Sequence, residues 1–232
     1  MTVMKKFFMM LAAMAMCAIS AMADDGEKLV ALTFDDGPNV STTVKVLDVL
    51  KENDVVATFF LCGKNIDAST REVMKRAVAQ GCELENHSRS HSHMSGMTAD
   101  KVRMEANFTS HVIRQVSGRM PQFFRAPYLD TSDLMYETID LTFIGGFDVK
   151  DWEPAVTAAD RSRDVLARVK DGDIVLLHDF EGNDATAEAL KTIIPELKKQ
   201  GYTLVTVSEL FKRKGITPVK HAKITYGNVY DK

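Results

Sequence analysis

The chain alternates short apolar runs with longer segments in which apolar residues recur every three to four positions. The short runs are rich in β-branched and aromatic residues and predict strands, while the longer segments predict amphipathic helices. The predicted strands cover residues 29–34, 56–61, 82–86, 122–125, 141–144, 173–177 and 202–207. The predicted helices cover residues 40–52, 71–80, 98–117, 132–140, 161–169 and 185–200.

Alternating strands and helices predict an α/β fold built from βαβ units with a parallel sheet. The sequence has no internal repeat, low-complexity tract or proline-rich linker, so a single domain is the simplest organisation. Periodicity alone leaves both an open sheet and a closed barrel as alternatives. In either case, right-handed crossovers place the carboxyl ends of the parallel strands on one edge, where ligand sites gather.

The first 23 residues have the layout of a secretory signal peptide. Two lysines precede an apolar run over residues 7–18, and small residues occupy positions 21 and 23. This three-part pattern predicts cleavage before Asp24 and a secreted or periplasmic mature protein without a membrane span. The apolar run is too short to cross a bilayer comfortably, and the alternative interpretation is a buried N-terminal helix.

Composition narrows the class of protein further. The 232 residues are 45% hydrophobic and 26% charged, which is typical of a globular chain and excludes a disordered or polytopic membrane protein. The formal net charge is -3; removing residues 1–23 removes two lysines and no acid, which leaves 27 − 32 = -5. This acidity argues against a nucleic-acid partner. The polar stretch 212–232 is expected to be a mobile extension beyond a catalytic domain over residues 24–211.

Polar residues follow five of the predicted strands, at the edge where the carboxyl ends of those strands meet. Desolvating such groups costs free energy unless they are paired or bind a metal, so their gathering predicts one functional site. In chain order they are Asp35 and Asp36, His87 and His91, Arg125 and Tyr128, Asp148, Asp151 and Trp152, and His178 and Asp179.

The two histidines of the segment HSRSH are candidate metal ligands. His87 and His91 are four residues apart, which predicts two imidazoles on one face of a helical turn and is a usual zinc-ligand spacing. Two histidines and one carboxylate leave coordination positions open, as a catalytic zinc site requires. Of the adjacent Asp35 and Asp36, one can bind a cation while the other faces the reaction. The alternatives are a solvated polar loop and a helix-capping aspartate before a Gly-Pro pair.

The remaining residues of this edge indicate proton transfer and substrate contact. His178 is a candidate general acid, and Asp151 would hold it protonated by favouring the imidazolium. Arg125 would pair with Asp35 and keep that carboxyl ionised. Trp152 suits a sugar face or a small apolar pocket. The alternatives are a hydrogen-bonded core histidine for His178 and simple core packing for Trp152.

Five motifs resemble those of the polysaccharide deacetylases, carbohydrate esterase family 4, whose domain is also called the NodB homology domain. The resemblance covers the chain from about Lys28 to Phe211. One departure is mild: Ser88 stands where threonine is common, and either hydroxyl can make the supporting hydrogen bond. The motifs are Thr33-Phe34-Asp35-Asp36-Gly37-Pro38, His87-Ser88-Arg89-Ser90-His91, Arg125-Ala126-Pro127-Tyr128, Asp148-Val149-Lys150-Asp151-Trp152 and Leu176-Leu177-His178.

The resemblance implies a distorted (β/α)7-type barrel and a divalent metal, most commonly Zn2+, with Co2+, Mn2+ or Ni2+ as alternatives. It implies metal ligation by Asp36, His87 and His91, with Asp35 as the general base and His178 as the acid that protonates the leaving group. The further roles that it implies are Arg125 orienting Asp35, Asp151 tuning His178, the backbone N–H of Tyr128 stabilising the oxyanion, and Leu176 and Trp152 lining a pocket for the acetyl methyl group.

The leading hypothesis is a secreted, monomeric, metal-dependent deacetylase that removes N-acetyl groups from a GlcNAc-containing polysaccharide, such as peptidoglycan or chitin oligosaccharide, and releases acetate. One alternative is an O-acetyl esterase acting on acetylxylan with the same metal centre. Another is a non-catalytic carbohydrate-binding protein on this fold. Asp35, Arg125 and His178 argue against the last alternative, because binding alone requires neither a base nor an acid.

Two cysteines remain in the mature chain, and their predicted positions argue against a disulfide. Cys62 falls at the carboxyl end of the second predicted strand and Cys82 at the amino end of the third. If these strands are parallel neighbours, the two residues differ in height by about four residues, or roughly 13 Å. A disulfide needs a Cα separation below about 7 Å, so no disulfide is expected despite export.

Overall fold

The computed structural model describes residues 26–232. The predicted signal peptide lies outside the described residues, so its presence stays a prediction. Within the described part, no helix combines the length and apolarity needed to cross a bilayer. The strands are β1 Lys28–Asp35, β2 Thr58–Leu61, β3 Glu83–Asn86, β4 Phe123–Phe124, β5 Thr142–Phe143, β6 Phe147–Asp148, β7 Asp173–His178 and β8 Tyr202–Leu204. The helices are α1 Thr42–Glu52, α2 Ala68–Ala79, α3 Ala99–Ser117, α4 Asp133–Thr138, α5 Ala158–Arg168, α6 Asp184–Lys199 and α7 Val207–Arg213.

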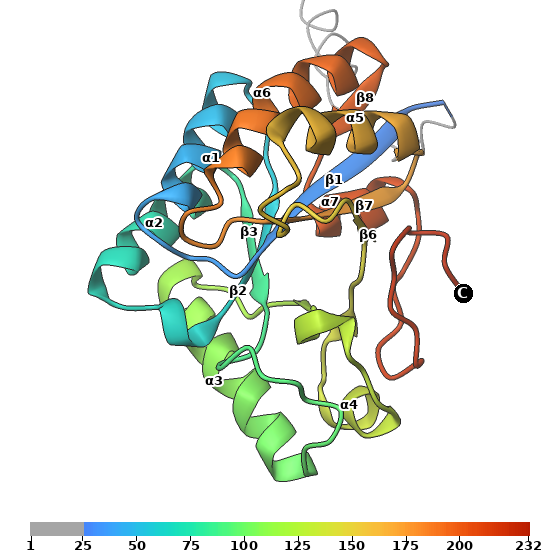
Figure 1. Cartoon of the computed structure of the whole chain (residues 1–232). Helices are drawn as coiled ribbons and strands as arrows, with labels where there is room; N and C mark the ends of the chain where they lie inside the picture. The colour runs from blue at the N-terminus through green and yellow to red at the C-terminus, as the bar shows by residue number, and fades with distance from the viewer. Residues whose placement is uncertain (1–25) are drawn as a thin grey trace, which may run out of the picture.

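The strands form one parallel sheet that curls into a barrel-like wall. Its order is β5-β4-β3-β2-β1-β7-β6, and β8 pairs with β1 off this path. Most of the helices lie outside the curled sheet (Figure 1). The α/β class, the single domain and the distorted barrel predicted from the sequence are therefore confirmed. In the described sheet the strand order ends at β5 on one side and at β6 on the other, which leaves a gap in the wall.

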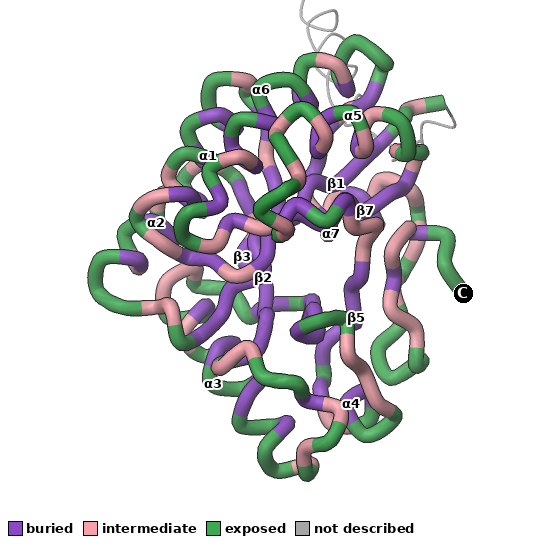
Figure 2. The backbone as a smooth tube through the Cα atoms, viewed as in Figure 1, coloured by how far each residue is buried: buried purple, intermediate pink, exposed green. Residues whose placement is uncertain are grey.

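The central strand β1 shows how the core is divided between two faces of the sheet. Leu32 and its alternate neighbours pack in the large apolar cluster under the outer helices. Ala31 and Leu29 join a second cluster inside the barrel. Because side chains alternate along a strand, Asp35 at the end of β1 shares the interior face with Ala31. The register pairs Asp35 with His178 of β7, so the carboxyl ends of both strands meet at one rim. Figure 2 shows buried backbone along these strands and exposed turns on the outer helices.

Several elements differ from the sequence-based expectation at their ends. Helix α2 begins three residues earlier than predicted, because the carboxylate of Asp67 accepts the backbone N–H of Thr70 at 2.9 Å and caps the helix. Strand β6 and helix α7 were not predicted, since both are too short to show a period. Helix α7 follows Thr206, whose hydroxyl accepts the N–H of Glu209 at 3.3 Å. The predicted last strand therefore ends with β8.

The C-terminal segment corrects the prediction of a mobile extension over residues 212–232. Its backbone bridges Ile144 through Tyr226 and bridges β7 through Asn228, so it lies along the gap between β5 and β6. The side chains of Tyr226 and Val229 are buried in the interior cluster. The segment looks polar in the sequence because only scattered positions face inward. It is part of the barrel wall, and the domain extends beyond residue 211.

We expect Tyr226→Ala to destabilise the fold by about 3 kcal/mol, because it empties the largest buried position of this segment. Tyr230→Ala is the matched control, since Tyr230 is 52% exposed and its loss is expected to cost about 0.5 kcal/mol or less. The free energy of unfolding in urea measures both. Equal, small effects would show that the C-terminal segment contributes nothing to the barrel wall.

The two cysteines lie at different heights in the sheet. The pairing of β2 with β3 sets Leu61 opposite Asn86, so Cys62 is level with position 87, five residues beyond Cys82. At about 3.3 Å per residue this corresponds to about 16 Å, well beyond disulfide reach. Both thiols are free and buried, so the prediction of no disulfide between them is confirmed.

Candidate active site

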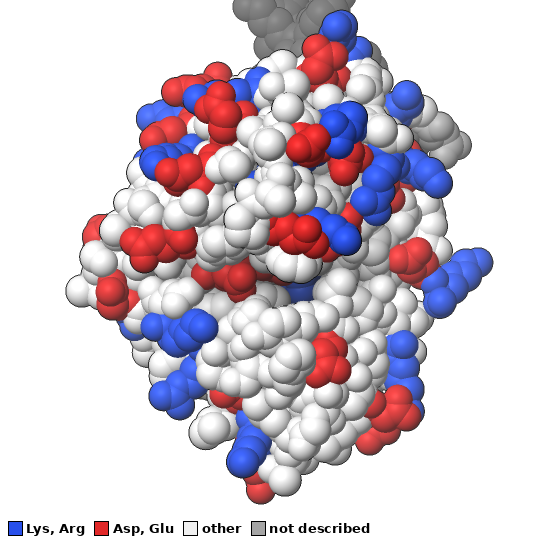
Figure 3. Space-filling view, viewed as in Figure 1, with Lys and Arg blue, Asp and Glu red and all other residues white. Residues whose placement is uncertain are grey.

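The rim at the carboxyl ends of the strands holds a cavity of about 410 Å³. Figure 3 shows a hollow near the middle of this face, with acidic side chains at its edge and a basic one deeper inside. Of the residues predicted at this rim, those that line the cavity are Asp35, Asp36, His87, His91, Tyr128, Asp148, Trp152, Leu176 and His178. Arg125 and Asp151 are fully buried and contact this lining from behind. The structure thus brings together all ten residues to which the family resemblance assigns a role.

Asp36, His87 and His91 each offer one ligand atom, and these atoms lie within 4.8 Å of one another. His91 Nε2 lies 3.0 Å and His87 Nε2 3.5 Å from Asp36 Oδ1. His87 Nδ1 lies 2.7 Å from the carbonyl oxygen of Arg125, which favours a proton on Nδ1 and leaves Nε2 free to bind a cation. Among residues 26–232, this is the one such cluster of histidine, cysteine and acidic side chains.

The histidine pair does not lie on a helical turn, which corrects that prediction. Residues 87–91 form a loop in which Ser88 and His91 have φ angles of 65° and 59°. The Ser88 hydroxyl accepts the N–H of His91 at 3.1 Å, and the carboxylate of Glu105 accepts the N–H of Arg89 at 3.0 Å. The loop brings the two imidazole centroids to 5.0 Å. The four-residue spacing of the two histidines is therefore accommodated by a tight loop, which the side chains of Ser88 and Glu105 stabilise.

The donor set fits a divalent cation. One carboxylate and two imidazoles are a common set for catalytic zinc, and three protein ligands leave positions open for water and substrate. Burial alone would raise the pKa of Asp36, but hydrogen bonds and charge from His87 and His91 outweigh it and hold that pKa well below its usual range. When bound here, a divalent cation supplies Lewis-acid polarisation of an acyl carbonyl and acidifies an attacking water.

Asp35 and Arg125 form a buried ion pair beside this cluster. Arg125 Nη1 donates to Asp35 Oδ1 at 2.6 Å and to Thr33 Oγ1 at 2.8 Å, which are alternate residues on the interior face of β1. The guanidinium lies over the ring of Phe60, with its carbon 4.1 Å from the centroid. These contacts fix the orientation of Asp35, whose second oxygen lies 3.7 Å from His87 Nε2. The carboxylate therefore faces the metal cluster.

Arg125 is held from its other side by the backbone of Gly145. Its Nη2 donates to the Gly145 carbonyl, and the Gly145 N–H donates at 2.8 Å to the carbonyl of Tyr226 in the C-terminal segment. Sequence reasoning missed this support, because a backbone carbonyl leaves no signal in the residue types. The C-terminal segment thus connects through Gly145 and Arg125 to Asp35.

His178 and Asp151 form the second acid–base pair. His178 Nδ1 lies 2.6 Å from one Asp151 oxygen, and the His178 backbone N–H donates to the other at 2.8 Å. Burial would lower the pKa of His178, but the hydrogen bond and charge of Asp151, with smaller contributions from Asp35 and Asp36, raise it to about 9. Its Nε2 is then a proton donor on the cavity side at neutral pH. The arrangement suits a general acid.

Asp151 is anchored by residues that sequence reasoning missed. Thr186 Oγ1 donates to it at 2.7 Å, and Asn183, the N-cap residue of α6, donates from its amide at 3.4 Å. Arg161 Nη1 in turn donates to both Asn183 and Thr186. The only signal available was position, since Asn183 follows His178 by five residues at the start of a predicted helix.

Tyr128 and Trp152 form the exposed part of the cavity lining. Tyr128 has a φ of 60° and is the second residue of a one-turn helix, Pro127–Leu129, so its N–H has no acceptor within that helix. Its ring stacks on His93, with 4.0 Å between centroids. Trp152 is 49% exposed, and its Nε1 donates to Asp148 at 3.4 Å.

Comparison with known proteins identifies the class to which this fold and site belong. A sequence model of the family described as polysaccharide deacetylase matches residues 23–142. The chain therefore belongs to the polysaccharide deacetylase family, carbohydrate esterase family 4.

The relatives include enzymes that are named for two kinds of polysaccharide. A bifunctional xylanase/deacetylase of Pseudobutyrivibrio xylanivorans is 49% identical over 198 residues, which are 85% of this chain and 33% of the relative. The peptidoglycan-N-acetylglucosamine deacetylase PgdA of Listeria monocytogenes is 36% identical over 188 residues, 81% of this chain and 40% of the relative. The structure of a family 4 acetyl xylan esterase from Clostridium thermocellum, in complex with cobalt, superposes with a TM-score of 0.85 at 44% identity and covers 88% of this chain and 100% of that one. The chain thus spans between a third and two fifths of the two curated relatives.

Proposed function

We propose that this protein is a metal-dependent hydrolase that removes acetyl groups from a polysaccharide, with Zn2+ as the metal. The observation that carries the proposal is the clustering of Asp36, His87 and His91 beside an aspartate–arginine pair and an aspartate–histidine pair at one rim. The cobalt-bound relative supports a divalent metal in this fold. A non-catalytic binding protein would need neither pair.

The two pairs flank the metal ligands and divide the proton transfers between them. Asp35, oriented by Arg125, would take a proton from the attacking water, and His178, held protonated by Asp151, would give one to the leaving group. The backbone N–H of Tyr128 would donate to the developing oxyanion, an interaction typically worth about 3 kcal/mol. Two further side chains, Leu176 and Trp152, would border the acetyl methyl group.

We propose O-acetylated xylan as the first substrate to test. The xylanase/deacetylase at 49% identity and the acetyl xylan esterase at 44% support this choice over the N-acetylated GlcNAc polymer favoured by the sequence analysis. The second candidate stays open, because PgdA is a peptidoglycan deacetylase and His178 is suited to protonating an amine, which leaves poorly without a proton.

Acetate release from acetylxylan, peptidoglycan and chitin oligosaccharides, with and without chelator, tests this proposal. We expect acetylxylan to give the highest kcat/KM, chelator to abolish the activity on every substrate, and added zinc to restore it. Acetate release that persists in chelator would contradict metal dependence. No release from any of the three polymers would contradict the deacetylase activity itself.

We also propose that the mature protein is a secreted monomer that begins at Asp24. The layout of residues 1–23 supports export, and acetylated polysaccharides of cell walls lie outside the cytoplasm. The N-terminal sequence of the protein recovered outside the cytoplasm tests this. A mature protein that begins at Met1 would contradict cleavage.

A further inference from the structure

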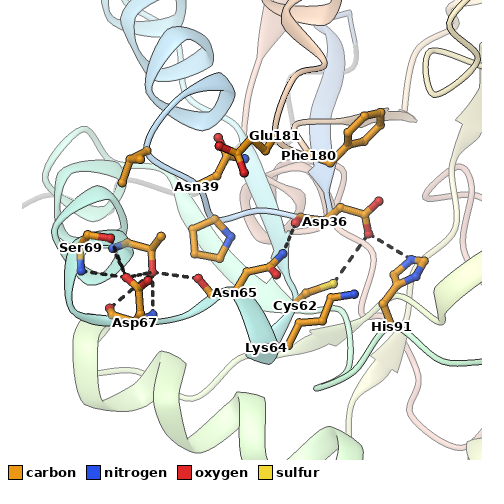
Figure 4. A pocket seen from close by; sticks show the side chains of 13 residues that line it. Asp36, Asn39, Cys62, Lys64, Asn65, Asp67, Ser69, His91, Phe180 and Glu181 are labelled. Carbon is orange, nitrogen blue, oxygen red and sulfur yellow. Dashed lines mark hydrogen bonds and ion pairs between the residues drawn. The ribbon is translucent and has the colours of Figure 1, made fainter.

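A second cavity of about 450 Å³ adjoins the first one at the metal ligands. Asp36 and His91 line both cavities, so the two form a single groove that passes the ligand cluster. Figure 4 shows Asp36 and His91 at one end of the second cavity and Asp67 at the other. If an acetyl group occupies the first cavity, the second is placed to receive a neighbouring unit of the same glycan.

Most polar side chains that line the second cavity already have partners within the protein. The Asn39 amide donates to the carbonyl of Asp179 at 2.6 Å, and the Asn65 amide donates to the carbonyl of Asp36 at 2.7 Å. Asp67 caps helix α2 and accepts backbone N–H groups there. These groups shape the cavity and leave little capacity for a ligand.

Lys64 and Glu181 are the charged side chains of this lining that remain available. Both are exposed, and neither forms a salt bridge within residues 26–232. Figure 4 shows the Lys64 amine directed toward the end of the cavity that holds Asp36 and His91, while Glu181 lies on the opposite wall beside Asn39. The cavity therefore presents a cation near the reaction centre and a carboxylate farther away.

The loop that carries Lys64 is joined to the loop of Arg89, whose side chain lines neither cavity. The Lys64 backbone N–H donates to the carbonyl of Arg89 at 2.7 Å, which ties the two loops together. The Arg89 guanidinium lies 4.5 Å from the ring centroid of Phe108 and makes no salt bridge in the described part of the chain. In a protein of net charge -3, a lysine without a carboxylate partner in the cavity lining favours an anionic ligand there.

Phe180 adds an apolar surface to the same cavity. Its side chain is partly buried, and its ring lies edge-on to His178, with 6.3 Å between the centroids. An aromatic face of this kind suits the C–H groups of a sugar ring. A cation, a carboxylate that can accept hydroxyl protons and an aromatic ring together match an acidic sugar.

We propose that this cavity is a subsite for a carboxylate-bearing sugar unit next to the acetylated one. Lys64 binds the carboxylate, Phe180 contacts the sugar ring, and Glu181 accepts hydrogen bonds from its hydroxyls. The inference rests on the proposed function, because it assigns the neighbouring unit of the same substrate. The carboxylate has two chemical sources, a uronic acid branch on a xylan or the lactyl ether of a muramic acid.

The test compares Lys64→Gln with Lys101→Gln, a control at an exposed lysine on α3 that also lacks a salt bridge and lines neither cavity. Acetate release is measured on acetylated xylo-oligosaccharides with and without a uronic acid branch, and on N-acetylated glycans with and without the lactyl group. We expect Lys64→Gln to lower the acidic-to-neutral ratio of kcat/KM about tenfold for one of the two sources, which identifies it. In 0.5 M salt we expect most of the wild-type preference to disappear. An unchanged ratio for both sources would overturn the subsite.

A binding measurement separates this inference from the proposed function. Calorimetric titration of the wild type with deacetylated, acid-bearing oligosaccharides requires no catalysis. Tighter binding of the acidic oligosaccharide than of its neutral counterpart, lost in Lys64→Gln and kept in Lys101→Gln, would support the subsite even if no acetate were released. Equal affinity for acidic and neutral oligosaccharides would overturn it even in an active enzyme.

Discussion

Asp35→Asn is expected to lower kcat by about 10³-fold while the protein continues to bind zinc. The substitution keeps the shape of the side chain and an oxygen that can accept from Arg125, but it removes a carboxylate that faces the metal ligands without being one of them. If Asp35 is the base, proton removal from the attacking water fails while the ligand set stays intact. The measurement is kcat on acetylxylan together with zinc affinity.

The buried position of Asp35 requires a control for folding. Removing its charge leaves the Arg125 guanidinium buried without a counter-charge, so a loss of about 3 kcal/mol in stability is also expected. Kinetics are therefore compared at a temperature where circular dichroism shows the variant to be folded. Asp100→Asn on α3, at a side chain that is 92% exposed, is the matched control and should retain full activity. A folded, zinc-bound Asp35→Asn protein with wild-type kcat would exclude Asp35 as the base.

Substitution of a metal ligand is expected to have a different effect from substitution of Asp35. Asp36→Asn is expected to weaken zinc binding, and added zinc should partly restore its activity. Added zinc should have no such effect on Asp35→Asn. Added zinc thus distinguishes these two adjacent residues, because it should restore activity only in the Asp36→Asn variant. Restoration of activity in both variants would mean that both residues are ligands.

The sequence could predict that the site residues meet at one rim, because their meeting follows from the topology of the sheet. Right-handed βαβ units place the ends of all parallel strands at one rim, so residues that follow different strands converge without any knowledge of their contacts. Asp35 and His178 illustrate this, since the β1–β7 register sets them opposite each other. Residue type then indicates the chemistry, as in the carboxylate and two imidazoles of the metal cluster.

The features that could not be predicted depend on backbone groups and on irregular conformation. A spacing of four residues is shared by a helical turn and by the loop that carries His87 and His91, and the positive φ angles of Ser88 and His91 separate the two. The supports of Arg125 include the carbonyl of Gly145, a group that every residue possesses. The C-terminal segment buries too few side chains, Tyr226 among them, to show a period.

Asp151→Asn is expected to move the alkaline limb of the pH–rate profile to lower pH and to reduce kcat above neutrality by up to about 10³-fold. In the native protein, burial would lower the pKa of His178, and Asp151 is the largest influence that opposes it and raises the pKa to about 9. A general acid must be protonated, so activity should fall as pH rises through that pKa. Without the Asp151 charge, burial remains and the pKa of His178 falls.

The free energy of unfolding should depend on pH in the same direction as the activity, and fall as the pH rises. A histidine whose folded pKa lies above its unfolded value of about 6.5 stabilises the fold fully below that pH, and the contribution is lost as pH rises toward 9. We therefore expect the unfolding free energy of the native protein to decline over this range, and that decline to be much weaker in Asp151→Asn. A divalent cation bound by Asp36 would offset part of the negative charge of Asp35 and Asp36 near His178. Asp151 would then account for a larger share of the effect that raises the pKa of His178.

The choice of leaving group isolates the role of the acid. 4-Nitrophenolate departs without a proton, whereas a sugar hydroxyl or amine needs one. Asp151→Asn should therefore impair deacetylation of the polysaccharide far more than hydrolysis of 4-nitrophenyl acetate, measured from pH 5 to 10. Equal losses on both substrates, with an unmoved alkaline limb, would show that Asp151 shapes the cavity without governing proton donation by His178.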